Sequence, residues 1–324
     1  MPKMTQYKEI FAAVGKAMAD LGGEIYLVGG AVRDMLTSVN SNDLDFVVIG
    51  KDYQEYAKLI AQNLKSHSIF FKDNVRIPYA GGYIDVSAPR GMSIEEDLKL
   101  RDFTINNLAM GMDGTIIGDN SDLTKRRIVP VHDKVFDDDP VRILRGFRQA
   151  AGLKFTLSDE FLTLAKAKVH LLPAVAGERI YEELKKLCQT KTVERLIYEQ
   201  ADECGLWKEL SGNHVKIDRL LAVHSRTELT DEKRMALYMA VLFTDGDITK
   251  LETLHPSKYV LRTSQLLLNL PASFTHLAAD DPQYAAWTQR KVLDILLPYI
   301  EICFNFHLAG VYAAVETINN YDAY

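Results

Sequence analysis

Two aspartates, Asp43 and Asp45, constrain this chain more than any other residues. They open an apolar run that continues to Ile49, and alternate residues of a β-strand point to the same face. Two carboxylates on one face can bind a hard divalent cation such as Mg²⁺. Upstream, an apolar run ends in Gly29-Gly30, where a bare backbone can approach a phosphate closely. Phosphate binding beside a metal pair is the apparatus of phosphoryl or nucleotidyl transfer.

The aspartate pair gains specificity from its surroundings. Surface carboxylates fall at alternate positions by chance, so an isolated pair is a weak signal. Here the segment GGAVRD ends at Asp34, and DLDFVV begins nine residues later at Asp43. The combination indicates a phosphate turn and a metal-binding strand in one small domain.

The bulk composition sets wide limits on function. The chain has 324 residues, enough for two or three domains, and its 47% hydrophobic and 25% charged residues are ordinary for a soluble protein. The net charge of −6 does not predict nucleic-acid binding, although a basic groove can occur on an acidic protein. Three widely separated cysteines without a CxxC pattern predict a reducing compartment and no zinc site: Cys188, Cys204 and Cys303.

The first residues, 1–23, predict an amphipathic helix. Its apolar stripe consists of Ile10, Phe11, Val14, Met18 and Leu21. Charged residues interrupt the segment, which therefore resembles neither a signal peptide nor a membrane span. We expect a cytoplasmic protein without a membrane partner.

Periodicity predicts an α+β chain with two contrasting parts. Alternating patterns predict strands at 24–28, 43–49, 68–71, 75–79 and 83–87, with helices at 31–36 and 53–64, which together make a small mixed sheet. From Asp139 onward strand signals nearly vanish, and prolines separate helical patterns at 141–152, 158–168, 177–189, 192–201, 231–243 and 289–304. The predicted domains are a head at 1–136, a helical neck at 137–200 and a helical body and tail at 201–324.

Three further segments carry unusual polar patterns. The cluster at 101–106, RDFTIN, taken alone indicates a helix start with a capping residue. The segment 137–148, DDDPVRILRGFR, begins with normal helix-capping chemistry but also has arginines at three-residue steps, which make either a basic stripe or a solvated face. The segment 178–184, ERIYEEL, taken alone is an ordinary helix with internal salt bridges.

Together these segments resemble the class II tRNA nucleotidyltransferase and bacterial poly(A) polymerase family, within the DNA polymerase β-like superfamily. GGAVRD with DLDFVV resembles the first family motif, and RDFTINNLAM resembles the second. DDPVRILRGFRQAA resembles the nucleotide-selecting motif, and GERIYEELKKL the helical motif that follows it. The motifs keep the family order over residues 24–190, and no motif matches beyond about residue 200.

The resemblance implies an activity and its substrates. Members add nucleotides to RNA 3′ ends without a template and release pyrophosphate. We therefore expect addition of C, with A left open, to the 3′ end of tRNA from CTP and ATP, with two Mg²⁺ ions as cofactors. The head would be a polymerase β-like catalytic domain, the neck would select the nucleotide, and the body and tail would bind RNA. The resemblance implies no protein partner.

The resemblance also assigns residues. Asp43 and Asp45 would be catalytic and hold the metal ions, while Asp85 is either a third carboxylate or a structural strand-end residue. The nucleotide-binding set would be Gly29, Gly30, Arg33, Arg101, Asn106, Asp139, Arg142, Arg145 and Arg148. The supporting residues would be Asp34, Asp102, Glu178 and Arg179.

Hydrogen-bond chemistry explains why Asp139 and Arg142 suit a selecting role. Cytosine and adenine both present an amino donor beside a ring-nitrogen acceptor, which complements a carboxylate next to a guanidinium. Guanine and uracil present a carbonyl in place of the amino group and would leave buried polar groups unpaired. Mispairing of this kind discriminates by roughly 10⁴-fold in favourable cases.

One departure from the family pattern bears on the product. Members usually have a long flexible stretch before the RDFTIN segment, whereas only residues 88–96 are available here. That loop is implicated in adding the terminal A, and CC-adding members carry a shortened one. We therefore expect addition of C and poor addition of A. Two substitutions also depart from the family pattern, with Asp138 at a position that is usually glutamate and Gln149 at one that is usually phenylalanine.

Two alternatives remain open. A poly(A) polymerase shares the motifs but often carries a basic extension, whereas this sequence closes with TINNYDAY at 317–324. A catalytically silent RNA-binding module belongs to another class and predicts a lost metal carboxylate, yet both Asp43 and Asp45 are present. A small-molecule nucleotidyltransferase would share the glycines and the aspartates but not the arginine helix.

Overall fold

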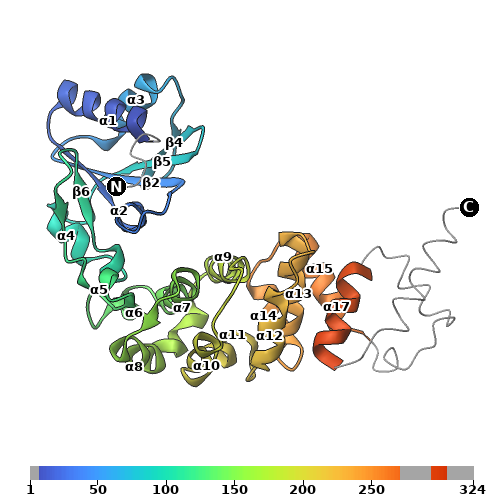
Figure 1. Ribbon diagram of the computed structural model, residues 1–324. Coiled ribbons are helices and arrows are strands. Elements are labelled where there is room, and N and C mark those ends of the chain that lie inside the picture. Colours follow the sequence, from blue (N-terminus) through green and yellow to red (C-terminus); the bar gives the residue numbers. More distant parts are fainter. Residues whose placement is uncertain (1–6, 271–292, 305–324) are drawn as a thin grey trace, which may run out of the picture. The chain divides into compact units, whose positions relative to one another are not determined.

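The computed structural model describes residues 7–270 and 293–304 (Figure 1). They fall into two compact units, Met1–Val135 with Thr156–Phe161, and Phe136–Phe155 with Leu162–Tyr324. The first unit contains a mixed sheet and the second is helical, so the predicted α+β class is confirmed. The division into three domains at residues 136 and 200 stays a prediction.

The first unit is built on a seven-stranded sheet with the order β3-β4-β5-β2-β1-β6-β7. The strands are β1 Glu24–Val28, β2 Asp43–Ile49, β3 Ile69–Phe70, β4 Asn74–Tyr79, β5 Gly82–Ser87, β6 Ala109–Gly111 and β7 Ile116–Ile117. Only β2 and β5 pair in parallel, while every other neighbouring pair in this sheet is antiparallel. The sheet is therefore mixed, as the sequence predicts.

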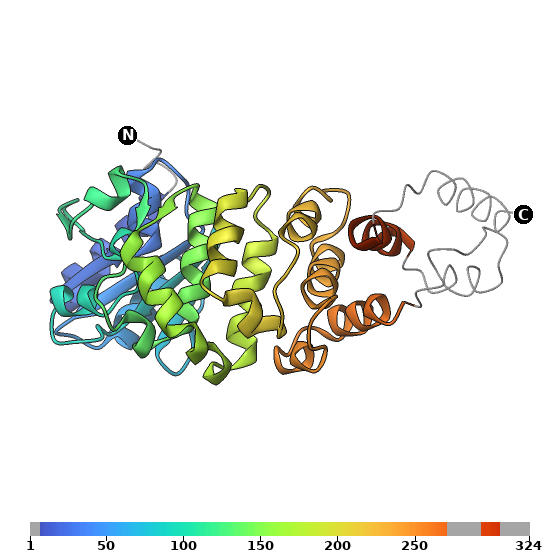
Figure 2. The ribbon, with the colours of Figure 1, turned by 90° about the horizontal axis from the view of Figure 1, so that it is seen from below.

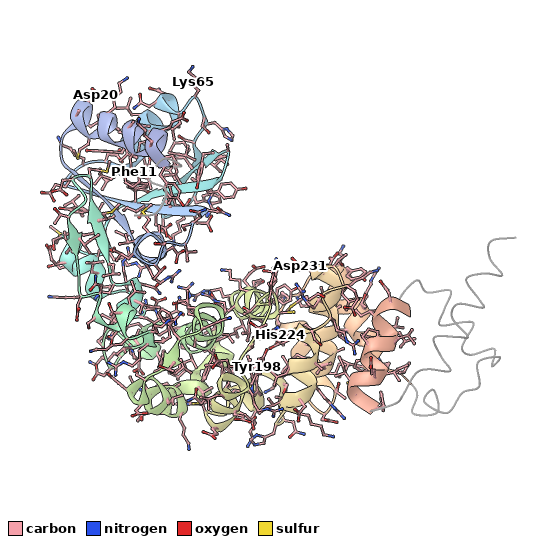
Figure 3. The ribbon with its side chains drawn as sticks, in the orientation of Figure 1. Phe11, Asp20, Lys65, Tyr198, His224 and Asp231 are labelled. Carbon is pink, nitrogen blue, oxygen red and sulfur yellow. The ribbon has the colours of Figure 1, made fainter. Side chains whose placement is uncertain are left out.

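Helices α1 (Lys8–Leu21) and α3 (Tyr53–Asn63) cover one face of this sheet (Figure 1). Phe11 of α1 points toward the sheet in Figure 3 and meets Phe46 of β2 edge to face, with ring centroids 6.2 Å apart. Because side chains alternate along a strand, Asp43 and Asp45 lie on the opposite face of β2 from Phe46. The apolar patterns of α1 and β2 thus fix which face the carboxylates occupy.

Shorter elements complete the first unit. They are α2 Gly30–Leu36, α4 Ile94–Lys99, the 3₁₀-helix Thr104–Asn106, α5 Ser121–Thr124, β8 Arg127–Ile128 and β9 Thr156–Leu157. Strand β9 comes from the chain beyond the first helix of the second unit, and it pairs in parallel with β8. Just after it, Phe161 packs against Phe103 with ring centroids 5.9 Å apart, and both side chains are fully buried. The chain therefore leaves the first unit and returns to complete it.

The second unit is a succession of helices (Figure 2). They are α6 Val135–Asp138, α7 Val141–Leu153, α8 Asp159–Lys168, the 3₁₀-helix Val169–Ala174, α9 Gly177–Cys188, α10 Arg195–Glu203, α11 Leu206–Ser211, α12 Ile217–His224, α13 Asp231–Phe243, α14 Thr249–Thr253, α15 Lys258–Leu268 and α17 Leu293–Phe304. Helix α13 is central, because it contacts α9, α11, α12, α15 and α17 and buries every residue from Met235 to Phe243.

A buried polar network joins α10, α12 and α13 (Figure 3). The Tyr198 hydroxyl lies 2.8 Å from His224 Nε2 and 2.8 Å from the Tyr238 hydroxyl, and His224 Nδ1 lies 2.7 Å from the Thr190 carbonyl oxygen. A neutral imidazole that donates to Thr190 and accepts from Tyr198 satisfies all these groups. Burial is the largest cause that lowers the pKa of His224, in keeping with the neutral ring.

Several predicted elements coincide with the observed ones. The bounds of β1, β2 and α13 are those predicted, whereas α4, β6–β9, α11, α12, α14 and α15 were not foreseen. The last predicted helix is seen from Leu293 to Phe304, and its first residues lie outside the described residues, as do Pro271, Pro282 and 317–324. Within residues 7–270 and 293–304, no helix is long and apolar enough to cross a membrane.

Candidate active site

A group of carboxylates lies at the middle of the sheet. Asp43 and Asp45 are exposed and share one side of β2, while Leu44 between them is buried. In the parallel pairing with β5, Asp45 stands opposite Asp85 and Asp43 stands opposite Tyr83. Neighbouring strands are about 4.8 Å apart, so Asp85 belongs to the same group of charges as the predicted metal pair.

Asp85 is already engaged by an arginine. Arg76 of β4 donates from Nε to one carboxylate oxygen at 2.9 Å and from Nη2 to the other at 2.7 Å. Among the described residues, no three His, Cys, Asp or Glu side chains are arranged to hold a metal ion. Asp43 and Asp45 stay the predicted metal pair, and Asp85 forms an ion pair with Arg76.

The pKa of Asp45 is raised by its surroundings. The pKa of Asp45 is raised from 3.8 to about 6, first because the surrounding protein desolvates the carboxylate and then because Asp85 adds negative charge. Arg101 and Arg76 lower it. A carboxylate that is costly to ionise beside other carboxylates favours binding of a cation, which offsets the repulsion.

The glycine turn after β1 is pressed against Arg101. Gly29 has a φ of 70°, and a Cβ atom there would lie 2.8 Å from Arg101 Nη1, so only glycine fits. Arg101 donates two hydrogen bonds to Asp97 Oδ2, from Nε at 2.9 Å and from Nη2 at 2.7 Å. Asp97 is only 1% exposed and was missed in the sequence, although Arg101 follows it by four residues, just beyond the end of α4, which was a usable signal.

A second guanidinium, that of Arg33, lies beside Gly30. Arg33 donates to Asp34 at 2.8 Å and to Asn106 Oδ1 at 2.7 Å. Asn106 donates in turn to Asp102 Oδ1 at 2.9 Å. A Cβ atom on Gly30 would lie 3.4 Å from Arg33 Nη2. The RDFTIN segment thus orients Arg33, so that two guanidinium groups flank the glycine turn.

In the second unit, the predicted selecting residues begin α7. Asp139 Oδ2 accepts from Arg179 Nη2 at 2.6 Å. Asp139 Oδ1 is buried and has no hydrogen-bond partner in the part of the chain that the structure describes. Arg142 follows within the first turn of α7 and is half-buried. One oxygen of Asp139 is therefore a buried acceptor whose hydrogen bonding the described residues leave unsatisfied.

The remaining arginines of α7 are braced by a residue that sequence reasoning missed. Glu183 of α9 is 3% exposed and accepts from Arg145 at 3.2 Å and from Arg148 at 2.5 Å. Its signal was a glutamate on the apolar face of an amphipathic helix. Glu178, expected to support the site with Arg179, is exposed and lies 4.0 Å from His255, and its supporting role stays a prediction.

The amino-acid sequence of this chain is similar to those of known proteins. Residues 25–129 match the family model described as the poly A polymerase head domain. A multifunctional CCA protein of Neisseria meningitidis serogroup A is 32% identical over 280 residues, which cover 79% of this chain and 60% of that protein. A CC-adding tRNA nucleotidyltransferase of Halalkalibacterium halodurans is 38% identical over 174 residues, which cover 52% of this chain and 46% of that protein.

A solved structure matches the fold over most of the chain. A tRNA nucleotidyltransferase complexed with a primer tRNA and an incoming ATP analog has a TM-score of 0.76 at 23% identity, covering 96% of this chain and 100% of that one. At this identity the likeness concerns the fold. The chain spans about 60% of the length of the first curated relatives that it matches.

The first unit therefore combines a mixed sheet, a carboxylate pair on its central strand and a glycine turn at the end of the neighbouring strand. Residues 25–129 match the model of the poly A polymerase head domain, so the resemblance of this chain to the tRNA nucleotidyltransferase and bacterial poly(A) polymerase family is confirmed.

Proposed function

We propose that this chain is an RNA nucleotidyltransferase that adds C to tRNA 3′ ends from CTP without a template, with release of pyrophosphate. The observation that carries the proposal is the carboxylate pair Asp43 and Asp45 beside a glycine turn flanked by two guanidinium groups. The names of its relatives, a multifunctional CCA protein and a CC-adding tRNA nucleotidyltransferase, support the choice of tRNA.

The donor set fits magnesium. Asp43 and Asp45 offer hard oxygen ligands on one face of β2, and the pKa of Asp45 is raised first by desolvation and then by the negative charge of Asp85, both of which a bound cation would offset. We propose that these two residues hold two Mg²⁺ ions, which would supply Lewis-acid stabilisation of the reacting phosphate. At neutral pH Asp45 is ionised despite its raised pKa of about 6.

The two guanidinium groups suit the triphosphate. Arg101 is fixed by a buried aspartate and Arg33 by Asp34 and Asn106, so neither needs to be ordered when the ligand binds. Gly29 and Gly30 let both guanidinium groups lie close to the backbone of the turn. We assign the binding and orientation of the triphosphate to these four residues.

Base selection belongs to Asp139 and Arg142 in this proposal. The unpaired Oδ1 of Asp139 suits the amino group of cytosine, and a neighbouring guanidinium suits its ring nitrogen. Arg179 fixes the other oxygen and so orients the carboxylate. Arg145 and Arg148 are held by Glu183 and would add positive charge for phosphate or base contacts.

The test is incorporation of labelled CTP and ATP, singly and together, into tRNA that lacks its CCA end, with sequencing of the new 3′ ends. The proposal expects C addition by the wild-type protein with Mg²⁺ and none by Asp45→Ala. Long A tails made with ATP alone would identify a poly(A) polymerase. RNA binding without any incorporation would identify a silent RNA-binding module.

A further inference from the structure

Three side chains stack on the sheet face opposite α1 and α3, beside the carboxylates. The guanidinium carbon of Arg76 lies 5.6 Å from the ring centroid of Phe71 and 5.0 Å from that of Tyr83. Phe71 is 51% exposed and Tyr83 is 44% exposed, which is unusual for large rings. The arginine therefore holds two aromatic rings that still offer surface to solvent. We call Phe71, Arg76 and Tyr83 the aromatic stack.

Strand pairing fixes the position of the aromatic stack. Tyr83 stands opposite Asp43, and Arg76 stands opposite Asp85, to which its edge is hydrogen-bonded. Val75 and Ile84, which alternate with these residues, are fully buried on the other face. The stack and the carboxylates therefore share one face of the sheet.

The order of the strands places the aromatic stack on one flank of the carboxylates. Strand β2 lies between β1, which ends in the glycine turn, and β5, which carries Tyr83. In phosphoryl transfer the attacking and leaving oxygens lie roughly in line, on opposite sides of the phosphorus. If the triphosphate occupies the β1 flank, the attacking RNA 3′-hydroxyl must approach from the flank of β5 and β4. That flank is where the stack lies.

We infer that the aromatic stack binds the terminal base of the RNA that is being extended. This inference rests on the proposed function. Stacking on an aromatic face accepts every base, because each has a π surface. That tolerance suits a primer whose last base changes after each addition. Arg76 is committed to Asp85 and to both rings, so it orients Phe71 and Tyr83, which make the contact.

The test compares the double variant Phe71→Ala/Tyr83→Ala with wild type in the full chain. Loss of stacking is expected to raise the KM for tRNA roughly tenfold. The KM for CTP, measured at saturating tRNA, should not change. Tyr83→Phe should behave as wild type, because the ring remains. The matched control is Phe70→Ala: this ring is 49% exposed but pairs with buried Val75 and lies under Lys58, on the opposite face.

A second substrate isolates the base. For wild type, kcat/KM should be roughly tenfold lower on tRNA whose last nucleotide is abasic than on ordinary tRNA. For the double variant, which has already lost the stacking rings, kcat/KM should be nearly the same on the two substrates. Equal losses by wild type and variant on the abasic substrate would overturn the inference, as would a rise in the KM for CTP equal to that for tRNA. Wild-type incorporation of C in the same assay keeps the proposed function standing whichever result the variants give.

Discussion

Asp45 lies among charges of both signs, and this decides how it responds to pH. Its pKa of about 6 in the folded chain exceeds the ordinary value of 3.8, so the folded state binds the proton more tightly than the unfolded state does. Stability therefore falls as the pH rises from about 4 to about 6, and the full penalty remains at pH 7. At neutral pH, where the proposed chemistry needs the charge of Asp45, that charge therefore lowers the stability of the folded chain.

The first prediction follows from that penalty. Asp45→Asn should abolish nucleotide incorporation and raise the thermal midpoint at pH 7, because the variant removes a repelled carboxylate without opening a core cavity. Mg²⁺ should raise the midpoint of wild type more than that of the variant. Calorimetry with and without Mg²⁺ measures both effects. Near-normal incorporation by both Asp43→Ala and Asp45→Ala would refute the metal assignment.

A second prediction concerns Asp139. Asp139→Ala should lower the preference for CTP over UTP by about 10–100-fold, because the acceptor for the base amino group is lost while the triphosphate contacts remain. The measurement is kcat/KM for all four nucleoside triphosphates on the same tRNA. Asp137→Ala is the control, since Asp137 pairs with Lys168 instead. An unchanged CTP preference at normal rate would place the selector elsewhere.

Some charged residues of the candidate site could be recognised from the sequence, and others could not. Asp43 and Asp45 were found because strand alternation fixes the direction of their side chains. Asp97 escaped notice although its arginine partner follows only four residues later, whereas the arginine partners of Glu183 come from another helix and no local pattern marks them. Asp85 could not be assigned for the same reason, since Arg76 reaches it across a strand pair.

At the scale of the elements, the segment between β5 and α4 is restrained by hydrogen bonds. Residue Ile94 already begins α4, so the free loop is shorter than the predicted stretch 88–96. The Arg90 amide donates to Asp97 at 3.0 Å, its guanidinium donates to the Leu100 carbonyl at 3.2 Å, and the Met92 amide donates to Glu96 at 2.6 Å. A segment held by these hydrogen bonds cannot easily change its conformation as the RNA end grows.

The third prediction concerns the product. The protein should add C residues to tRNA and add the terminal A slowly or not at all. Cytosine and adenine share an edge but differ in size, so accepting both in turn requires a movement that this loop cannot supply. Rates of CTP addition to tRNA lacking CCA, and of ATP addition to tRNA ending in CC, measure it. Comparable rates would restore a full CCA product.

The polar network of α10, α12 and α13 gives the fourth prediction. Because burial lowers the pKa of His224 below its ordinary 6.5, the unfolded chain binds the proton more readily, and stability should fall as the pH drops through about 6.5. His224→Phe should remove this dependence and cost about 1–3 kcal/mol at pH 7, since the Thr190 carbonyl loses its donor. Unfolding midpoints from pH 5 to 8 test this.

A matched control separates this histidine from the others. His67 is exposed in the first unit, so His67→Asn should leave the acid sensitivity of the second unit intact. Persistence of the full pH dependence in His224→Phe would mean that other groups carry it.

Over the whole molecule, the first unit depends on residues that come after α7. Phe161 is fully buried against Phe103, and β9 pairs with β8. The fifth prediction is that Phe161→Ala destabilises the first unit by about 3–5 kcal/mol. Hydrogen exchange should speed up around Phe103 while α13 stays protected. Phe304→Ala is the control, because this ring is 39% exposed. Unchanged exchange around Phe103 would favour a head that is complete at residue 136.

The sequence predicts the molecule best where one periodic pattern is long. The amphipathic α1 and the apolar run of β2 were recognised, since each buries one face over many residues. The two-residue strands β7, β8 and β9 are too short for any period to register. Helices α11, α12 and α14 are five to eight residues long and depend on contacts made elsewhere in the fold, so local patterns could not define them.

The return of the chain at β9 has a consequence for synthesis. A ribosome delivers residues at about 5–20 per second, so the segment from 136 to 161 takes roughly one to five seconds to follow. During that interval β8 has an open edge and Phe103 lacks its covering ring. The nascent head is therefore exposed to proteases and to wrong strand partners until α7 has also emerged, so slow codons in this stretch would lengthen its most vulnerable period.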